Sequence, residues 1–185
     1  MLLQELFVEF ISDAQKFSAP AIFNCLSLKG KIMSARAYQE KGKTLIEKRD
    51  KTPYKVLVAE DKDIAQRMAQ IVFEALNCVT EFVSNGEEAL QAACNNYYDV
   101  IFMDCRMPLI DGMEVTKALR MFETTHPNRR RVPVVALTSL AMKEDRDRCL
   151  ASGMDDYLAK PLRPEKAIEI INKLCARTED FQERW

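Results

Sequence analysis

This sequence of 185 residues has few glycines, a single histidine and almost no net charge. It has five glycines and one histidine, and its 27 Lys and Arg residues nearly balance its 28 Asp and Glu residues, which gives a net charge of −1. A charge so close to zero gives no support for binding to nucleic acid through bulk electrostatics, so we expect no nucleic-acid partner. The few glycines also form no Gly-rich nucleotide-binding loop.

Long apolar runs and paired cysteines are missing as well. No apolar stretch approaches the roughly 18 residues of a membrane span, and Glu5, Glu9 and Asp13 interrupt the region where a signal peptide needs an apolar centre. The six cysteines are scattered without a C-x-x-C pair, which favours reduced thiols over a disulfide framework or a zinc site. We therefore expect a cytoplasmic protein with no membrane span.

The sequence does have enough apolar material for a core, with 48% hydrophobic and 30% charged residues. We predict an N-terminal helical extension and basic linker over residues 1–53, a main domain over 54–176 and a short tail over 177–185. Apolar residues at spacings of three and four predict an amphipathic helix over residues 1–17. Its apolar stripe could cover the main domain, join two chains as a homodimer, or remain from a larger upstream region, and these alternatives stay open.

The main domain alternates short apolar runs with amphipathic segments. Strands are predicted at residues 55–59, 78–83, 99–104, 132–137 and 154–159. Helices are predicted at residues 63–76, 87–95, 112–122, 142–151 and 164–176. Such alternation implies parallel strands joined by right-handed crossovers, with helices on both faces of the sheet. The pattern predicts a doubly wound α/β domain.

Charged and hydroxyl side chains follow these strands where each one ends. They are Glu60, Asp61, Asp104, Thr138, Ser139 and Lys160. Each alone is typical of an ordinary turn, but the carboxyl ends of parallel strands meet at one edge of the sheet, where ligands bind. Crowded carboxylates favour a hard cation such as Mg²⁺, and a nearby ammonium and hydroxyl suit phosphoryl oxygens. These residues therefore predict phosphoryl chemistry on Asp104, by nucleophilic attack of its carboxylate.

Five ordered motifs in the main domain resemble the receiver domain of two-component response regulators. They are Val58–Asp61, Met103–Pro108, Asp111–Gly112, Ala136–Ser139 and Tyr157–Pro161. The first two are most similar to receivers of hybrid histidine kinases. The resemblance implies a flavodoxin-like fold: a five-stranded parallel sheet in the order 2-1-3-4-5 with five helices.

The resemblance also implies how the strand-end residues work together. Asp104 would be the phospho-acceptor, and Mg²⁺ would be held by Glu60, Asp61, Asp104 and the backbone carbonyl of Arg106. Lys160 would contact the phosphoryl group, and it precedes Pro161 at a position similar to the family's cis peptide. Thr138 and Tyr157 would be the switch pair, acting on an output surface made by the fourth helix, fifth strand and fifth helix.

Two features depart from the family's usual pattern. Asp63 adds a negative charge near the predicted acidic site, where hybrid-kinase receivers often have an uncharged polar residue. Residues 129–131 are three successive arginines, more cationic than expected before the fourth strand. A solvated loop is the simpler interpretation of this basic stretch, and docking of a partner is the alternative.

The donor of the phosphoryl group must be another protein. The only histidine, His126, precedes Pro127 in a predicted polar loop, which is a poor position for a phosphorylated helical histidine. We therefore expect a histidine kinase or a histidine phosphotransfer protein as partner, and no enzyme activity beyond self-catalysed phosphotransfer and dephosphorylation of Asp104. About nine residues follow Ala176, so we expect no DNA-binding output domain there.

Two other functions remain as alternatives. A non-phosphorylated interaction module could have kept the fold, although the complete acidic set argues against it. An aspartate-nucleophile phosphatase typically needs a second Asp two residues after the first, where this chain has Arg106. The sequence also leaves open whether the chain is a stand-alone protein, which is slightly favoured, or the tail of a hybrid kinase.

Overall fold

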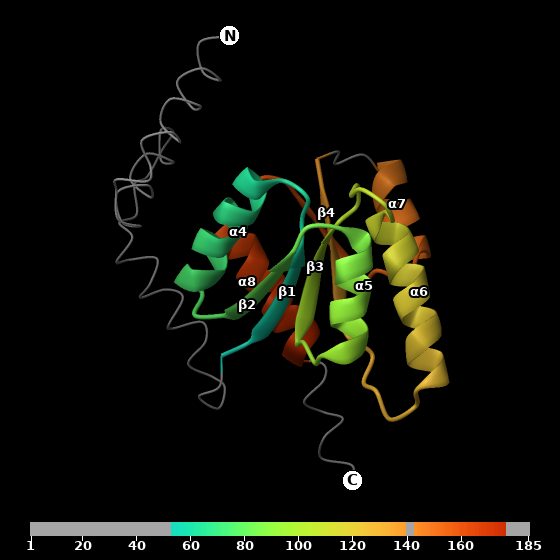
Figure 1. Cartoon of the computed structure of the whole chain (residues 1–185). Helices are drawn as coiled ribbons and strands as arrows, with labels where there is room; N and C mark the ends of the chain where they lie inside the picture. Colours follow the sequence, from blue (N-terminus) through green and yellow to red (C-terminus); the bar gives the residue numbers. More distant parts are fainter. Residues whose placement is uncertain (1–52, 140–142, 177–185) are drawn as a thin grey trace. The chain divides into compact units, whose positions relative to one another are not determined.

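The computed structural model describes residues 53–139 and 143–176, which belong to one compact unit (Figure 1). The predicted helix over residues 1–17, most of the linker, the tail and the possible homodimer contact lie outside the described residues. The division into residues 1–53, 54–176 and 177–185 stays a prediction.

Five parallel strands form a single sheet in the order β2-β1-β3-β4-β5. The strands are β1 Lys55–Ala59, β2 Val79–Val83, β3 Val100–Asp104, β4 Val134–Thr138 and β5 Asp156–Ala159. Their order confirms the predicted flavodoxin-like topology. It also places the carboxyl ends of β1 and β3 side by side, because Ala59 is paired with Met103.

Helices cover both faces of this sheet (Figure 1). They are α4 Asp63–Ala75, α5 Gly86–Asn95, α6 Gly112–Thr125, α7 Lys143–Ala151 and α8 Pro164–Ala176. Helices α4 and α8 lie together on one face, and α5, α6 and α7 lie on the other. The predicted boundaries agree with the observed ones within two residues, except at the end of α6.

Alternating strand residues build a core on each face. Phe102 of β3 points to the face of α4, where its ring lies 4.9 Å from that of Phe73. Ile101 points the opposite way and packs with Ala89 of α5 and Val115 of α6. Every residue of β3 and β4 is buried, which explains why these strands are continuously apolar up to their polar last residues.

Helix α6 runs three residues beyond the predicted end at Phe122. The hydroxyls of Thr124 and Thr125 donate to the carbonyls of Met121 and Phe122, at 2.7 and 2.9 Å. These bonds satisfy carbonyls of the last turn, so the polar residues continue the helix instead of starting the predicted loop.

The fourth strand begins at Val134 and not at the predicted Val132. Pro133 has no backbone N–H, and the N–H of Val132 donates to the carboxylate of Glu123 at 2.8 Å. Neither residue therefore donates a ladder bond, although the carbonyl of Pro133 still accepts the N–H of Ile101 on β3 at 2.9 Å.

Helix α7 ends at Ala151, as predicted. Gly153 has a φ of 99°, in the left-handed region that favours glycine. Its N–H donates to the carbonyl of Leu150, and that of Met154 donates to the carbonyl of Cys149, the two bonds of a Schellman cap. Within the described part of the chain, no helix is long and apolar enough to cross a membrane.

Candidate functional site

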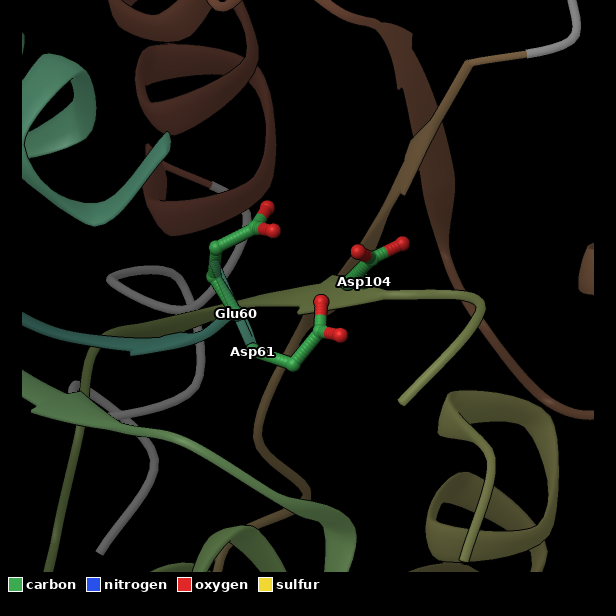
Figure 2. Close-up of side chains that lie close together, drawn as sticks. All are labelled: Glu60, Asp61 and Asp104. Atoms are coloured by element: carbon green, nitrogen blue, oxygen red, sulfur yellow. The ribbon is translucent and has the colours of Figure 1, made fainter. Parts of the chain in front are cut away.

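Three carboxylates gather where β1 and β3 end (Figure 2). The chain turns out of the sheet at Glu60 and Asp61 directly after β1, and Asp104 is the last residue of β3. One oxygen from each side chain lies within 4.8 Å of the others. These residues, together with Lys160, are called the acidic pocket below.

Two oxygen atoms of the acidic pocket are buried without a hydrogen-bond partner among the described residues. They are Oε1 of Glu60 and Oδ1 of Asp61. Buried polar atoms nearly always have a partner, so this pair is exceptional. Carboxylate oxygens are the ligands that Mg²⁺ prefers. The acidic pocket therefore fits a hard divalent cation.

Lys160 follows β5 and reaches across the end of β4 to the other members of the acidic pocket. Its Nζ donates to Oδ2 of Asp104 at 2.6 Å and forms a second ion pair with Glu60. The peptide bond to Pro161 is cis, as the resemblance implied. One ammonium thus faces three carboxylates, and the acidic pocket keeps an excess of negative charge.

Burial and charge shift the pKa values of two groups in the acidic pocket. Burial raises the pKa of Glu60, and the charge of Asp104 adds to this, against the opposing hydrogen bond from Lys160. Burial by itself would lower the pKa of Lys160, but its hydrogen bonds to Asp104 and Glu60 outweigh that effect and raise it. The lysine therefore stays charged near neutral pH, where it can neutralise a phosphoryl oxygen.

The loop after β3 holds the Asp104 carboxylate from the other side. The N–H of Arg106 donates to Oδ1 of Asp104 at 3.1 Å. The Arg106 guanidinium donates to the hydroxyl of Ser139 at 2.8 Å, joining the loops that follow β3 and β4. The predicted use of the Arg106 carbonyl as a metal ligand stays a prediction.

Thr138 and Tyr157 lie on neighbouring strands beside the acidic pocket. Thr138 is buried at the end of β4, and its carbonyl accepts the N–H of Lys160 at 2.8 Å. Tyr157 on β5 is half-buried, and the Arg146 guanidinium lies 5.1 Å from the centre of its ring. The structure brings the two predicted switch residues to adjacent strands. Their switching stays a prediction.

Gln66 is a site residue that the sequence did not reveal. Its side-chain amide donates to the carbonyl of Glu60 at 2.7 Å and to the hydroxyl of Ser84 at 3.2 Å. It thereby fixes the turn that presents Glu60 and Asp61. A glutamine in the second turn of an amphipathic helix is too common to signal this function.

The basic stretch at residues 129–131 is not simply a solvated loop. Arg129 donates to the carbonyls of Ala93 and Asn96, both at 2.9 Å, and so closes the end of α5. Arg131 pairs with Asp155. Asp63, the other departure, is exposed in the first turn of α4, where a negative charge suits the helix N-terminus.

Comparison with known proteins gives a family for this chain. The family model described as the response regulator receiver domain matches residues 56–172. The chain is 38% identical over 115 residues to hybrid signal transduction histidine kinase K of Dictyostelium discoideum, covering 60% of this chain and 10% of that protein. The chain therefore spans about a tenth of the length of this curated relative.

Solved structures show the same domain. A receiver domain of a sensor histidine kinase from Pseudomonas aeruginosa, with magnesium coordinated in its active site cleft, has a TM-score of 0.61 and 34% identity, covering 68% of this chain and 99% of that one. A receiver domain crystallised with a histidine phosphotransfer signaling protein of Saccharomyces cerevisiae has a TM-score of 0.65 and 26% identity, covering 70% of this chain and 94% of that one. With its sheet order and its acidic pocket, this chain belongs to the response regulator receiver domain family of two-component phosphorelay systems.

Proposed function

We propose that this protein accepts a phosphoryl group on Asp104 from a phospho-histidine protein, in a Mg²⁺-dependent reaction, and signals through protein contacts. The observation that carries the proposal is the position of Asp104. One of its oxygens accepts a bond from Lys160 and the other a bond from Arg106, beside two buried carboxylate oxygens without a partner.

Transfer requires that a carboxylate oxygen of Asp104 attack phosphorus while the bond from phosphorus to the donor's histidine nitrogen breaks. The electron pair of that bond leaves with the imidazole, and the product is an aspartyl phosphate. Lys160 neutralises charge on the transferred group, as cationic clamps do in phosphoryl transfer. The chain catalyses the transfer, and the later hydrolysis, only on its own Asp104.

The cation in this proposal is Mg²⁺. Its ligands would be Glu60, Asp61, Asp104 and the backbone carbonyl of Arg106. When bound, it neutralises the three carboxylates and stabilises negative charge on the phosphoryl oxygens. The two unpartnered oxygens support this assignment, as does the similar Pseudomonas aeruginosa receiver domain with magnesium in its active site cleft.

The signal would pass through Thr138 and Tyr157. Phosphorylation adds acceptor oxygens beside Thr138, whose hydroxyl would bond to one of them, and the Tyr157 ring would turn inward behind it. Phosphorylation would thereby increase the fraction of molecules in the conformation with Tyr157 turned inward. The surface that changes is then α7, β5 and α8.

Two exposed apolar side chains on the segments that follow the acidic residues support a protein as the donor. Ile64 stands three residues after Asp61 and is 54% exposed, and Leu109 stands five residues after Asp104 and is 74% exposed. We expect Ile64→Asp to slow transfer from a phosphorylated histidine phosphotransfer protein and leave phosphorylation by acetyl phosphate unchanged. Equal slowing with both donors would contradict a docking function for Ile64.

We place the relay in the cytoplasm, which the scattered cysteines support, and we keep a homodimer through residues 1–17 as a prediction. Light scattering of the chain with and without residues 1–52 tests the homodimer. We expect the full chain to be a dimer and the truncated chain to be a monomer. If both chains are monomers, the homodimer prediction is wrong.

The proposed function is tested with acetyl phosphate as the donor. Intact mass measured after incubation with acetyl phosphate and Mg²⁺ should rise by one phosphoryl group, and EDTA or Asp104→Asn should prevent this. Asp63→Asn is the matched control, because it removes an exposed carboxylate near the same turn. A folded wild-type protein that is never phosphorylated would instead favour the non-phosphorylated interaction module.

A further inference from the structure

Two cysteine sulfurs are in contact directly behind the acidic pocket. The Sγ atoms of Cys105 and Cys149 are 3.4 Å apart, and both residues belong to the core between the sheet and α5, α6 and α7. Cys105 is the residue after Asp104, and Cys149 lies in α7. A disulfide has its sulfurs about 2.05 Å apart, so closing this pair takes a movement of roughly 1.4 Å.

Other thiols in the described part of the chain are arranged differently. Cys78 and Cys175 donate to the backbone carbonyls of Leu76 and Asp99, at 3.7 and 3.5 Å. Their sulfurs therefore have other partners, whereas Cys105 and Cys149 point at each other. This contrast singles out one pair for disulfide formation.

We propose that Cys105 and Cys149 form a redox modification site, in which a hydroperoxide closes a disulfide beside Asp104 and slows phosphorylation of that residue. The link to phosphorylation rests on the proposed function, whereas disulfide formation does not.

The chemistry proceeds in two steps. The half-buried Cys105 sulfur attacks the peroxide oxygen, the O–O bond breaks, and the products are a sulfenic acid and water. The Cys149 sulfur then attacks the sulfenic sulfur, an S–S bond forms, and a second water leaves. Two thiols and one hydrogen peroxide thus give one disulfide and two waters. Burial raises the pKa of Cys105 well above its usual range, so we expect the first step to be slow.

The position of Cys105 explains why the disulfide would reach the acidic pocket. Its N–H donates to the carbonyl of Leu137 on β4, at 3.1 Å, and its carbonyl accepts the N–H of Gly112, at 3.2 Å. Pulling the Cys105 side chain toward α7 strains both bonds. Cys105 lies between Asp104 and Arg106, whose N–H holds the Asp104 carboxylate, so the strain would move that carboxylate. A misplacement of about 1 Å at a reacting group can reduce a rate on the order of a hundredfold. We expect the oxidised protein to be phosphorylated on the order of tenfold more slowly.

The test uses the full chain, reduced and then exposed to hydrogen peroxide for several hours. Peptide mass spectrometry should find the Cys105 and Cys149 peptides joined, with the loss of two hydrogens, and dithiothreitol should separate them. Cys149→Ser should abolish this cross-link. Cys94→Ser, which changes a half-buried cysteine of α5, is the matched control and should keep it.

The rate of phosphorylation by acetyl phosphate is then compared in oxidised, reduced and re-reduced samples. The rate should fall on oxidation and recover with dithiothreitol in the wild type, and it should not respond to peroxide in Cys105→Ser, which lacks the sulfur that peroxide oxidises first. A folded protein that forms no cross-link, or forms only sulfinic acid at Cys105, would overturn the proposal, as would a cross-linked protein with an unchanged rate. If the reduced wild type is never phosphorylated, the link to Asp104 fails together with the proposed function. Peptide mass spectrometry would still show whether the disulfide forms.

Discussion

The acidic pocket and a second charge cluster use similar groups in opposite ways. The second cluster, called the arginine network here, contains Arg120, Glu123, Arg131 and Asp155. Its two guanidinium groups balance its two carboxylates. In the acidic pocket, one ammonium faces three carboxylates.

The two regions also differ in how their oxygens are bonded. In the arginine network, Glu123 accepts from Arg120 at 2.7 Å and from the N–H of Val132 at 2.8 Å. Asp155 accepts from Arg120 at 2.8 Å, from the N–H of Val134 at 2.9 Å and from Arg131. By contrast, the acidic pocket keeps two buried oxygens without partners in the described residues.

This difference separates a stabilising network from a binding site. A balanced and fully bonded network fastens the end of α6 to the loops before β4 and β5. An unbalanced pocket lowers the stability of the fold, and binding of a cation can recover that loss. The contrast predicts that changes in the arginine network reduce stability, and that changes in the acidic pocket reduce function.

The largest change in stability is expected from Arg120→Leu. The variant leaves Glu123 and Asp155 mostly buried without their shared cation, with side chains 8% and 17% exposed. Removing one partner from a buried pair costs about 3–5 kcal/mol. Urea denaturation should show this loss, and the folded variant should still be phosphorylated.

Arg67→Leu provides the matched control for this prediction, because Arg67 is an exposed arginine of α4. We expect it to change the free energy of unfolding by less than about 0.5 kcal/mol. Equal effects of the two substitutions would show that the arginine network has no special importance.

The next effect concerns Mg²⁺ and Asp61. A cation that binds only the folded state stabilises it by about 2.7 kcal/mol at a hundred times its dissociation constant. Asp61→Asn should remove most of this gain and raise the stability of the metal-free protein by about 0.5–2 kcal/mol, because it relieves repulsion. Thermal unfolding with Mg²⁺ and with EDTA measures both changes. If Asp61→Asn is less stable than wild type in EDTA, the carboxylates of the acidic pocket do not destabilise the metal-free protein by repulsion.

A smaller loss is expected from Gly153→Ala, which disturbs the arginine network indirectly. Gly153 has a φ of 99°, and an added Cβ would lie 3.0 Å from Cγ of Arg120. Left-handed backbone at a residue with a Cβ costs roughly 1–2 kcal/mol. Urea denaturation should show this loss, and Gly153→Asn should recover part of it, because asparagine tolerates that conformation. A neutral Gly153→Ala would show that the cap contributes little.

The smallest effect is a pH dependence that comes from Glu60. Its pKa is raised above the ordinary value of 4.5, mainly by burial, so the folded state binds more protons than the unfolded state as this group titrates. The free energy of unfolding should therefore fall as the pH rises through that range. Wild type in EDTA should lose stability relative to Glu60→Gln as the pH rises from 4.5 through the raised pKa of Glu60. A relative gain over that range would mean that the pKa of Glu60 is lowered.

The fold and most of the acidic pocket could be predicted from the sequence. Apolar runs alternating with amphipathic helices require parallel strands, and parallel strands bring their ends together. Glu60, Asp61, Asp104 and Lys160 were therefore predictable neighbours, because each directly follows or ends a predicted strand.

The supporting contacts could not be predicted, because they join residues far apart in the chain. The Arg106 guanidinium bonds to Ser139, the Gln66 amide bonds to the hydroxyl of Ser84, and Arg129 closes the end of α5. Each depends on how two elements pack, which no local pattern encodes. The longer α6 was missed for a different reason: threonine hydroxyls satisfied its last carbonyls where polarity predicted a loop.

The most direct test is transfer from a phosphorylated histidine phosphotransfer protein to this chain in Mg²⁺, followed by peptide mapping of the phosphoryl group. We predict one phosphoryl group on Asp104, lost in EDTA and absent from Asp104→Asn. Two results would contradict the proposed function. In one, the folded chain binds Mg²⁺ but takes up no phosphoryl group from the histidine phosphotransfer protein or from acetyl phosphate. In the other, the phosphoryl group is found on a residue other than Asp104.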